Sequence, residues 1–486
     1  MTLPEPDNQP PENPSYLAEG LMAHGRDIGH RGAAWIIGPI LVGLLAVGMA
    51  MGSDQMHILN AHLVQIHPYA PLLFMPCGFA LLAWLGNRFF PGSQGSGIPQ
   101  TIAATDASSD VDVGYLLSWR IVVGKVLLTL GGIGIGASIG REGPTIQIGA
   151  SVMHSFFGRG PFQQVESRRI LILAGGAAGI AAAFNTPLAG IMFAIEELSK
   201  KHVFNANSSS LVTIIVSGLI SLSVLGSYTY FGTTESYLSW NGSLGAILLC
   251  GLVGGAAGGL FSRLFILISF YLPQPLADLA KSKPLWFAAG CGLIVAALGV
   301  ATHGLVFGSG YDPTKMSLEN SVALPWYFGV AKFVATLLSA TSGIAAGIFA
   351  PSLSVGAGLG DNIAALLPAM ADHSAIVLLV MAAYLSGVTR APVTSFIISM
   401  EMTNSHQMLL PLMVASVVAS QISKLFCPEP LYHKLSEKFI EPPAGYVKRP
   451  PVSLSTRISD QDNAQVKYSS EVKKHEQNEN SKNIVD

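Results

Sequence analysis

The fold is decided by residues 124–150, GKVLLTLGGIGIGASIGREGPTIQIGA. This stretch is apolar almost throughout, yet it contains Lys125, Arg141 and Glu142. Charged side chains are costly inside a membrane, so they usually face a pathway or a partner within the protein. Its glycines allow a close approach of the backbone, and Pro144 stands where a helix can begin. The stretch therefore predicts an interrupted helix that exposes backbone N–H groups beside one carboxylate.

The predicted break at residues 140–144 has the character of an anion site. Free N–H groups at the start of a helix attract anions, and Glu142 is itself an anion tethered there. We therefore expect a free anion and the Glu142 carboxylate to compete for one place. A metal site needs clustered carboxylates, imidazoles or thiolates, which the breaks in this sequence do not supply. We expect neither a metal nor a cofactor.

The composition is typical of a membrane protein. Hydrophobic residues make up 50% of the 486 residues, and charged residues only 12%. An average soluble protein carries about 25% charged residues. The charged residues also crowd into the first 31 positions and the tail after Glu441. A net charge of −2, without a basic patch interleaved with aromatic residues, excludes nucleic acid as a partner.

Residues 33–52 and 71–89 are long enough to span a bilayer, whereas many other apolar stretches are too short. The short stretches lie at 98–104, 149–157, 169–184 and 187–198, and further apolar segments are expected near 208–230, 243–273, 285–306, 323–340, 351–368, 374–388, 392–403 and 407–427. Interrupted half-length helices are tolerated at membrane depth only where protein or a cavity surrounds them. This pattern is typical of a transporter or a channel.

An internal repeat divides the chain. Residues 185–196 and 390–401 resemble each other, and in each a proline stands nine residues before the final glutamate. Upstream of each lies a Gly-rich break that ends in proline, at 140–144 and at 347–351. Broken helices at corresponding places in two halves predict a substrate site at their interface. The repeated text leaves open whether the halves are parallel or inverted.

These features predict four parts of the chain. They are a cytoplasmic arm (1–32), a first membrane repeat (33–230), a second membrane repeat with a final helix (231–441) and a disordered cytoplasmic tail (442–486). The tail is too polar to bury a core and too short for a regulatory domain of usual size, so we expect no paired regulatory (CBS) domains.

Candidate anion ligands occur in residues 95–99, 140–144, 347–351 and 430–433. Hydroxyls and backbone N–H groups offer partial positive charge, which replaces water around an anion and still lets the anion move on. The role of Lys125 stays open between two alternatives. It is either a buried cation that raises anion affinity from a distance or a side chain that reaches to the membrane interface.

The motifs resemble those of the CLC family of chloride channels and transporters. They are GSGIP (95–99), GREGP (140–144), GIFAP (347–351), FNTPLAG with the following EE (184–197) and PLY (430–432). They occur in the family's order and cover about residues 33–440. The resemblance implies an all-α polytopic membrane protein, an inverted-repeat bundle of many tilted and partly broken helices. It also implies a homodimer with one pore per subunit in the cell (inner) membrane, with both termini cytoplasmic.

The resemblance further implies a chloride site. Chloride would be held by the hydroxyls of Ser96 and Tyr432 and by backbone N–H groups of Ile348 and Phe349. Serine at position 96, where nitrate-preferring members have proline, favours chloride. The sequence departs from the family at Gln100, where glutamate is usual, and at residues 343–346, which lack a proline.

The resemblance also implies roles for two acidic residues. Backbone groups at Arg141 and Gly143 would form an outer anion site, to which we assign Lys125 as well. Glu142 matches the external gate, and Glu197 matches the internal proton relay of the exchangers. We therefore expect a secondary active transporter, not an enzyme, that exchanges chloride for protons across a lipid bilayer.

Two alternatives remain open. A passive chloride channel gated by Glu142 would share every feature of the anion site. A membrane enzyme or a scaffold without transport is the other class, because Glu196 and Glu197 are paired carboxylates of the kind used in acid–base chemistry. No nucleophile or metal cluster accompanies that pair, which argues against an enzyme.

Overall fold

The computed structural model of the protein describes residues 14–108, 111–158, 162, 164–199, 208–226, 230–232, 238, 240–320, 323–367 and 372–441. Its helices belong to one compact unit, which comprises residues 1–108 and 113–443. The disordered tail that the sequence predicts lies outside the described residues. So does the start of the predicted arm.

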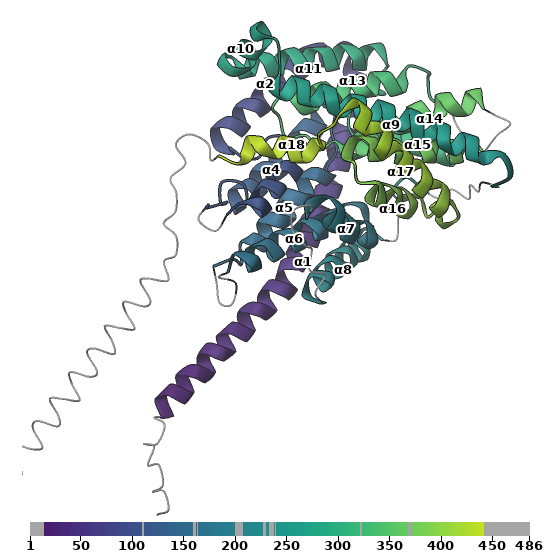
Figure 1. Ribbon diagram of the computed structural model, residues 1–486. Helices are drawn as coiled ribbons and strands as arrows, with labels where there is room; N and C mark the ends of the chain where they lie inside the picture. Colours follow the sequence, from purple (N-terminus) through teal and green to yellow (C-terminus); the bar gives the residue numbers. More distant parts are fainter. Residues whose placement is uncertain are drawn as a thin grey trace, which may run out of the picture. The chain divides into compact units, whose positions relative to one another are not determined.

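The described chain is a bundle of helices, many of them short (Figure 1). The helices of the first half are α1 (Pro14–Ile66), α2 (Pro71–Phe89), α3 (Ile98–Asp106), α4 (Trp119–Gly134), α5 (Glu142–His154), α6 (Val165–Phe184), α7 (Pro187–Phe193), the π-helix η1 (Ala194–Leu198) and α8 (Ser208–Leu225). Those of the second half are α9 (Trp240–Phe270), α10 (Gln274–Ser282), α11 (Pro284–Ala301), α12 (Tyr311–Asn320), α13 (Phe328–Thr341), α14 (Phe349–Leu366), α15 (His373–Thr389), α16 (Pro392–Thr403), the 3₁₀ turn η2 (His406–Met408), α17 (Leu409–Phe426), α18 (Leu431–Ser436) and the 3₁₀ turn η3 (Glu437–Phe439).

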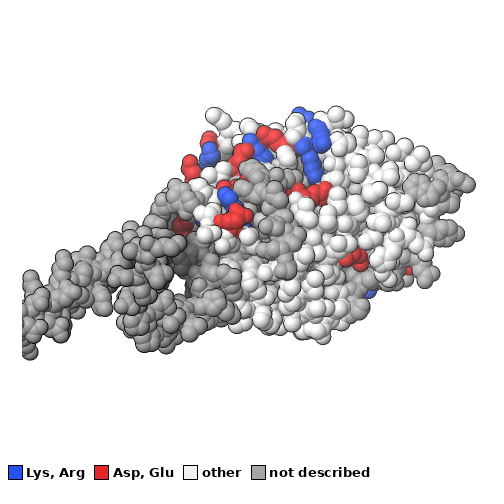
Figure 2. All heavy atoms as spheres, turned by 60° about the horizontal axis from the view of Figure 1, so that its bottom comes forward, with Lys and Arg blue, Asp and Glu red and all other residues white. Residues whose placement is uncertain are grey.

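Six helical segments of the described chain are long and apolar enough to cross a membrane. They are Ala34–Ile66, Pro71–Phe89, Val165–Phe184, Ser243–Phe270, Pro284–Ala301 and His406–Phe426. Figure 2 shows a broad surface with few charged residues, most of which are gathered near its upper edge. The exposed side chains of the described chain include many large hydrophobic ones, such as Leu73, Leu219 and Trp286, and a surface of this kind suits contact with lipid. The protein is therefore a polytopic membrane protein.

One expectation about helix length is wrong, and one helix is longer than expected. The stretch 169–184 was expected to be shorter than a crossing, but α6 begins at Val165 and its 20 residues suffice. The polar residues from Pro14 onward, which the sequence assigns to an arm, are helical and form the first turns of α1, a single helix of 53 residues. Proline at the first helical position costs no hydrogen bond, and elongating an existing helix is easier than nucleating a new one.

Two helices were not expected from the sequence. The helices α10 and α12 are short and polar, so neither contains the apolar run by which the other helices were recognised. In contrast, α16 coincides with the expected segment 392–403, and α3 is as short as expected at nine residues. The apolar pattern therefore finds helices that pack in the core and misses those at its edge.

The interrupted helices lie in the interior. Every residue of α5 from Glu142 to Met153 is buried, and so is nearly all of α14. The helix α15 is buried from Ser374 to Thr389 and packs against α9, α14 and α17. Irregular backbone at membrane depth must be surrounded by protein, because lipid cannot satisfy its polar groups. The packing of this bundle meets that condition.

The two repeats are inverted. Both carboxylate oxygens of Glu196 accept hydrogen bonds at the start of α16, from the N–H groups of Val393 (3.0 Å) and Thr394 (2.7 Å). Glu401, at the equivalent position of the second repeat, accepts one from the N–H of Ala189 in α7 (2.9 Å). Each helix thus ends at the beginning of the other. The two equivalent segments run antiparallel, as inversion requires.

Candidate functional site

Three breaks that are far apart in the sequence meet at one place. The N–H of Gly95 donates to the carbonyl of Ile344 (2.8 Å), and the N–H of Ala346 donates back to the carbonyl of Gly95 (3.0 Å). The N–H of Gly140 donates to the carbonyl of Gly347 (2.8 Å). These bonds join the segments that contain Ser96, Glu142 and Phe349. The N-termini of α5 and α14 therefore start at a common site, as the repeat predicts.

Glu142 is the first residue of α5, and its side chain lies at the N-terminus of α14. Its side chain is fully buried, and one carboxylate oxygen (Oε2) lies 3.4 Å from the N–H of Ala350 in the first turn of that helix. The other oxygen (Oε1) accepts a hydrogen bond from the Tyr230 hydroxyl at 3.0 Å. A methyl group on the α carbon of Gly140 would collide with Oε2, so the Glu142 side chain would have to move. The carboxylate occupies a position that the helix dipole makes favourable for an anion.

Neither contact of Glu142 could be assigned from motifs. Ala350 belongs to the GIFAP motif, in which the resemblance assigns the anion to Ile348 and Phe349. Tyr230 belongs to none of the motifs. Its hydroxyl reaches Glu142 across 88 positions of the chain.

Gly143 and Ser96 lie against each other. A methyl group placed on the α carbon of Gly143 would stand 2.8 Å from the Ser96 carbonyl oxygen and 2.9 Å from its hydroxyl oxygen. This second glycine therefore permits the loop of Ser96 to approach the first turn of α5. The Ser96 hydroxyl oxygen also lies 3.3 Å from the N–H of Ile98.

Tyr432 is stacked on Phe349. Their ring centroids are 6.2 Å apart and the ring planes differ by 5°. Tyr432 is fully buried, and its hydroxyl has no hydrogen-bond partner among the described residues. Buried hydroxyls are almost always hydrogen-bonded, and an anion is a suitable acceptor for this one. Phe349 begins α14 and Ile348 caps it, so both backbone groups lie at the same helix start.

The loop that carries Ser96 is held by two side chains. The Gln100 amide oxygen accepts from the N–H of Gly97 (3.0 Å), and its amide nitrogen donates to the carbonyl of Gln94. Glutamine can donate and accept, so it closes the loop where the family usually has glutamate. Lys125 is fully buried and donates to carbonyls of this loop. The alternative that it reaches the membrane interface is therefore wrong, and any effect on the outer anion site is indirect.

Glu197 is fully buried on the π-helix η1. The imidazole Nε2 of His433 lies 4.0 Å from its carboxylate and 3.2 Å from its backbone carbonyl. His433 directly follows Tyr432 in α18. Short π-helical turns are frequent at functional sites. Through His433, Glu197 lies beside α18, the helix that carries Tyr432.

A cavity of about 1030 Å³ lies beside Arg141. We call it the Asp54 cavity, and its lining includes Asp54, His57, Arg141, Tyr230, Tyr311 and Asp312. The Arg141 guanidinium pairs with Asp54 (3.5 Å) and donates to the carbonyl of Ala50 (2.8 Å). The Arg141 side chain thus points to α1, while its backbone begins α5.

The helix starts, the unsatisfied hydroxyl and the buried carboxylate define a polytopic membrane protein with an interior site of anion-binding character. Residues 77–424 match the family described as Voltage gated chloride channel. The chain belongs to this family, that of the CLC channels and transporters. The resemblance of its motifs is thereby confirmed.

Similar proteins include exchangers. The chain is 31% identical over 419 residues to the H(+)/Cl(-) exchange transporter ClcA of Yersinia pestis bv. Antiqua (strain Angola), which covers 81% of this chain and 84% of the relative. It is 31% identical over 386 residues to the protein of that name from Citrobacter koseri, covering 76% of this chain and 80% of the relative. The crystal structure of a slow cyanobacterial Cl-/H+ antiporter superposes with a TM-score of 0.73 at 26% identity, covering 85% of this chain and 98% of that one.

Proposed function

We propose that this protein is a secondary active transporter that exchanges chloride for protons. Its relatives are named for that exchange. The observation that carries the proposal is the position of the Glu142 carboxylate, which lies against the N–H of Ala350 at the start of α14. A group that gains and loses a proton there links the occupancy of the site by chloride to protonation.

Linkage follows from the competition for one helix start. Ionised Glu142 lies against the N–H of Ala350, at the helix start that also carries the N–H groups of Ile348 and Phe349. Protonated Glu142 has no charge to keep it there. Proton binding and chloride binding then favour each other, and this coupling is reciprocal. Glu142 thus acts as the external gate.

Chloride is held by dipoles and hydroxyls in this proposal. The hydroxyls of Ser96 and Tyr432 and the N–H groups of Ile348 and Phe349 surround it. Backbone groups of residues 141–143 provide the outer site. Partial charges bind an anion strongly enough to replace its water but weakly enough to release it.

The proton needs a route of its own. The ring of Tyr432 is stacked on Phe349 beside the anion site, where chloride would pass. We assign that route to Glu197, whose buried carboxylate lies 4.0 Å from the partly exposed His433. A carboxylate can take up and release a proton without moving chloride. Glu197 is therefore the internal proton relay.

We place the protein in the cell membrane as a homodimer with one pore per subunit and both termini in the cytoplasm. The six long apolar helices of the described chain and the family to which the chain belongs support a membrane location. The transported ions are chloride and protons, and transport in this scheme needs no cofactor.

Reconstituted liposomes test the proposal. A chloride gradient across vesicles that contain the protein should drive protons against their own gradient. Glu197→Gln should abolish the proton flux and spare most of the chloride flux. Glu166→Gln changes an exposed glutamate of α6 and should leave both fluxes unchanged. Chloride flow without proton movement in the parent protein would support the channel instead, and absence of anion flux would refute both.

A further inference from the structure

Tyr230 binds the carboxylate of Glu142 at the oxygen that does not face α14. It belongs to the short described segment 230–232 between α8 and α9. Its hydroxyl donates to Oε1 of Glu142 at 3.0 Å, while Oε2 of the same carboxylate faces the N–H of Ala350 at 3.4 Å. The carboxylate is therefore held at both oxygens. Only one of these two donors belongs to a family motif.

The ring of Tyr230 is fixed by its neighbours. Its centroid lies 5.5 Å from that of Phe184, 4.9 Å from Phe231 and 5.4 Å from Tyr311, and each pair meets edge to face. The Arg141 guanidinium lies 5.6 Å from the same centroid. Aromatic and cation–π contacts of this geometry are stabilising. The hydroxyl is consequently presented to Glu142 by a rigid support.

Tyr230 also stands between the gate and the Asp54 cavity. It lines the cavity and is only 3% exposed, whereas Glu142 is fully buried. A Glu142 side chain that moves toward the cavity must first release the Tyr230 hydroxyl. The strength of this one hydrogen bond then enters the equilibrium between the seated and released gate.

We propose that Tyr230 is a positioning residue that holds the ionised Glu142 carboxylate in its seat and thereby sets the pH at which the gate opens. This inference rests on the proposed function of Glu142. A hydroxyl donates a stronger hydrogen bond to a carboxylate than to a neutral carboxyl group. The bond therefore favours the ionised, seated gate over the protonated, released one.

Other charged and titratable groups face the gate or its support. They are Arg141 at the start of α5, Tyr432 on α18, and around the Asp54 cavity Asp54 and His57 on α1, Asp312 on α12 and the nearby Lys332 on α13. All of them remain when the Tyr230 hydroxyl alone is removed. A comparison with the parent protein therefore isolates that hydroxyl.

The test is the pH dependence of chloride flux in liposomes. Tyr230→Phe keeps the ring and its packing but removes the donor, so the ionised carboxylate loses support and takes up a proton at higher pH. The pH of half-maximal flux should move upward by about one unit, a tenfold change in proton affinity. Tyr311→Phe removes a hydroxyl from the same aromatic cluster and should leave the profile unchanged. An unchanged or downward-shifted profile for Tyr230→Phe overturns the inference.

The double variant, with Tyr230→Phe added to Glu142→Gln, separates this inference from the proposed function. In Glu142→Gln the gate no longer titrates, so adding Tyr230→Phe should not change the flux further. If the added change raises flux there as much as in the parent protein, Tyr230 acts elsewhere and the inference fails. If Glu142→Gln alone keeps the pH dependence of the parent, the proposed gate itself is wrong.

Discussion

Lys125 and Lys332 perform the same task in the two inverted repeats. Both are fully buried, and each ammonium donates to two backbone carbonyls that are two positions apart in the chain. Lys125 binds the carbonyls of Ser93 (2.8 Å) and Gly95 (2.7 Å). A buried ammonium requires such partners, because burial without them would be too costly.

The second lysine holds a second Gly-Ser-Gly loop. Lys332 donates to the carbonyls of Val306 (2.9 Å) and Gly308 (2.7 Å). Residues 308–310 repeat the Gly-Ser-Gly of residues 95–97. Each lysine also precedes the proline of its Gly-rich break by nineteen residues. The repeat therefore extends from the broken helices to the lysines that hold their loops.

The two lysines allow a matched experiment. Lys125→Met leaves two buried carbonyls without a donor and should shift the loop of Ser96. We expect chloride affinity, measured by calorimetry in detergent, to fall about tenfold, or ~1.4 kcal/mol. Lys332→Met removes the equivalent bonds away from Ser96 and should lower thermal stability without this loss. Equal losses of affinity in both variants would contradict the assignment.

The repeat and the broken helices could be predicted because each is marked by a short pattern of neighbouring residues. The spacing of proline and glutamate in residues 185–196 and 390–401 identified equivalent segments. Their inversion was not readable, because it rests on bonds between Glu196 and α16 that span 197 and 198 positions. The helices α10 and α12 were missed because they contain no apolar run. The apolar pattern does not indicate the part of α1 before residue 33, because the residues there are polar.

The site was only partly predictable. The motifs selected Ser96, Glu142, Phe349 and Tyr432, and the structure brings the segments that contain them to one place. The sequence of residues 308–310 repeats that of residues 95–97. The similarity ends there, because Tyr-Asp follows the second loop and Ile-Pro follows the first. Tyr230 could not be found, because a single tyrosine outside a motif carries no signal about which distant carboxylate it contacts.

Glu196 and Glu401 should contribute to stability through the helices that they cap. Glu196→Ala removes the acceptor of two N–H groups at the start of α16, and we expect it to lower the free energy of unfolding by about 2 kcal/mol. Thermal unfolding can be followed with a thiol-reactive dye, because Cys250 and Cys291 are buried. Glu166→Ala, which loses only a surface pair with Arg169, should cost about 0–1 kcal/mol. A Glu196→Ala variant as stable as that control would show that the caps are dispensable.

Gly143→Ala should impair chloride transport through a steric effect. The added methyl group would lie 2.8 Å from the Ser96 carbonyl oxygen, so the Ser96 loop must move. We expect chloride flux in liposomes to fall about tenfold or more, since displacing a binding group by a fraction of an ångström is costly. Gly290→Ala on α11 meets nothing within 4 Å and should keep the parent's flux. Normal flux in Gly143→Ala would argue against a close role for Ser96.

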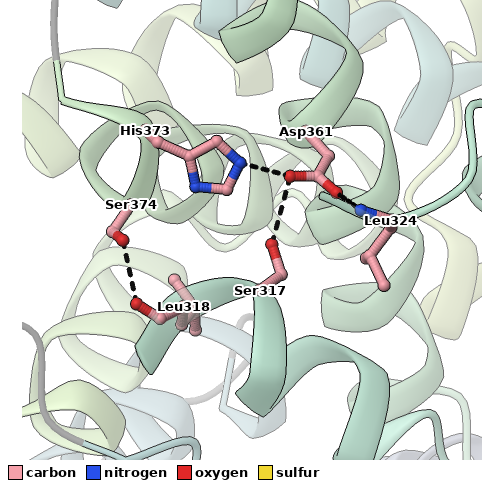
Figure 3. A network of polar contacts seen from close by, with 6 residues as sticks. All are labelled: Ser317, Leu318, Leu324, Asp361, His373 and Ser374. Carbon is pink, nitrogen blue, oxygen red and sulfur yellow. Dashed lines mark hydrogen bonds and ion pairs between the residues drawn. The ribbon is translucent and has the colours of Figure 1, made fainter. Parts of the chain in front are cut away.

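Asp361 ties three elements together (Figure 3). Its carboxylate lies 2.5 Å from the imidazole Nε2 of His373 and accepts from the Ser317 hydroxyl at 3.2 Å and from the N–H of Leu324. Replacing a buried carboxylate by alanine strands these donors, so Asp361→Ala should destabilise the protein by about 3 kcal/mol in the dye assay. Asp278→Ala, on an exposed position of α10, should change stability by less than about 0.5 kcal/mol. Equal melting temperatures for the two variants would contradict a structural role for this network.

The most direct test is chloride and proton flux through liposomes that contain Glu142→Gln, measured across a range of pH. Glutamine cannot ionise, so nothing in the seat at α14 would respond to pH. Chloride flux that no longer depends on pH, together with the loss of proton transport, is the result that the account predicts. Flux that follows pH as in the parent protein, with protons still carried against their gradient, would contradict it.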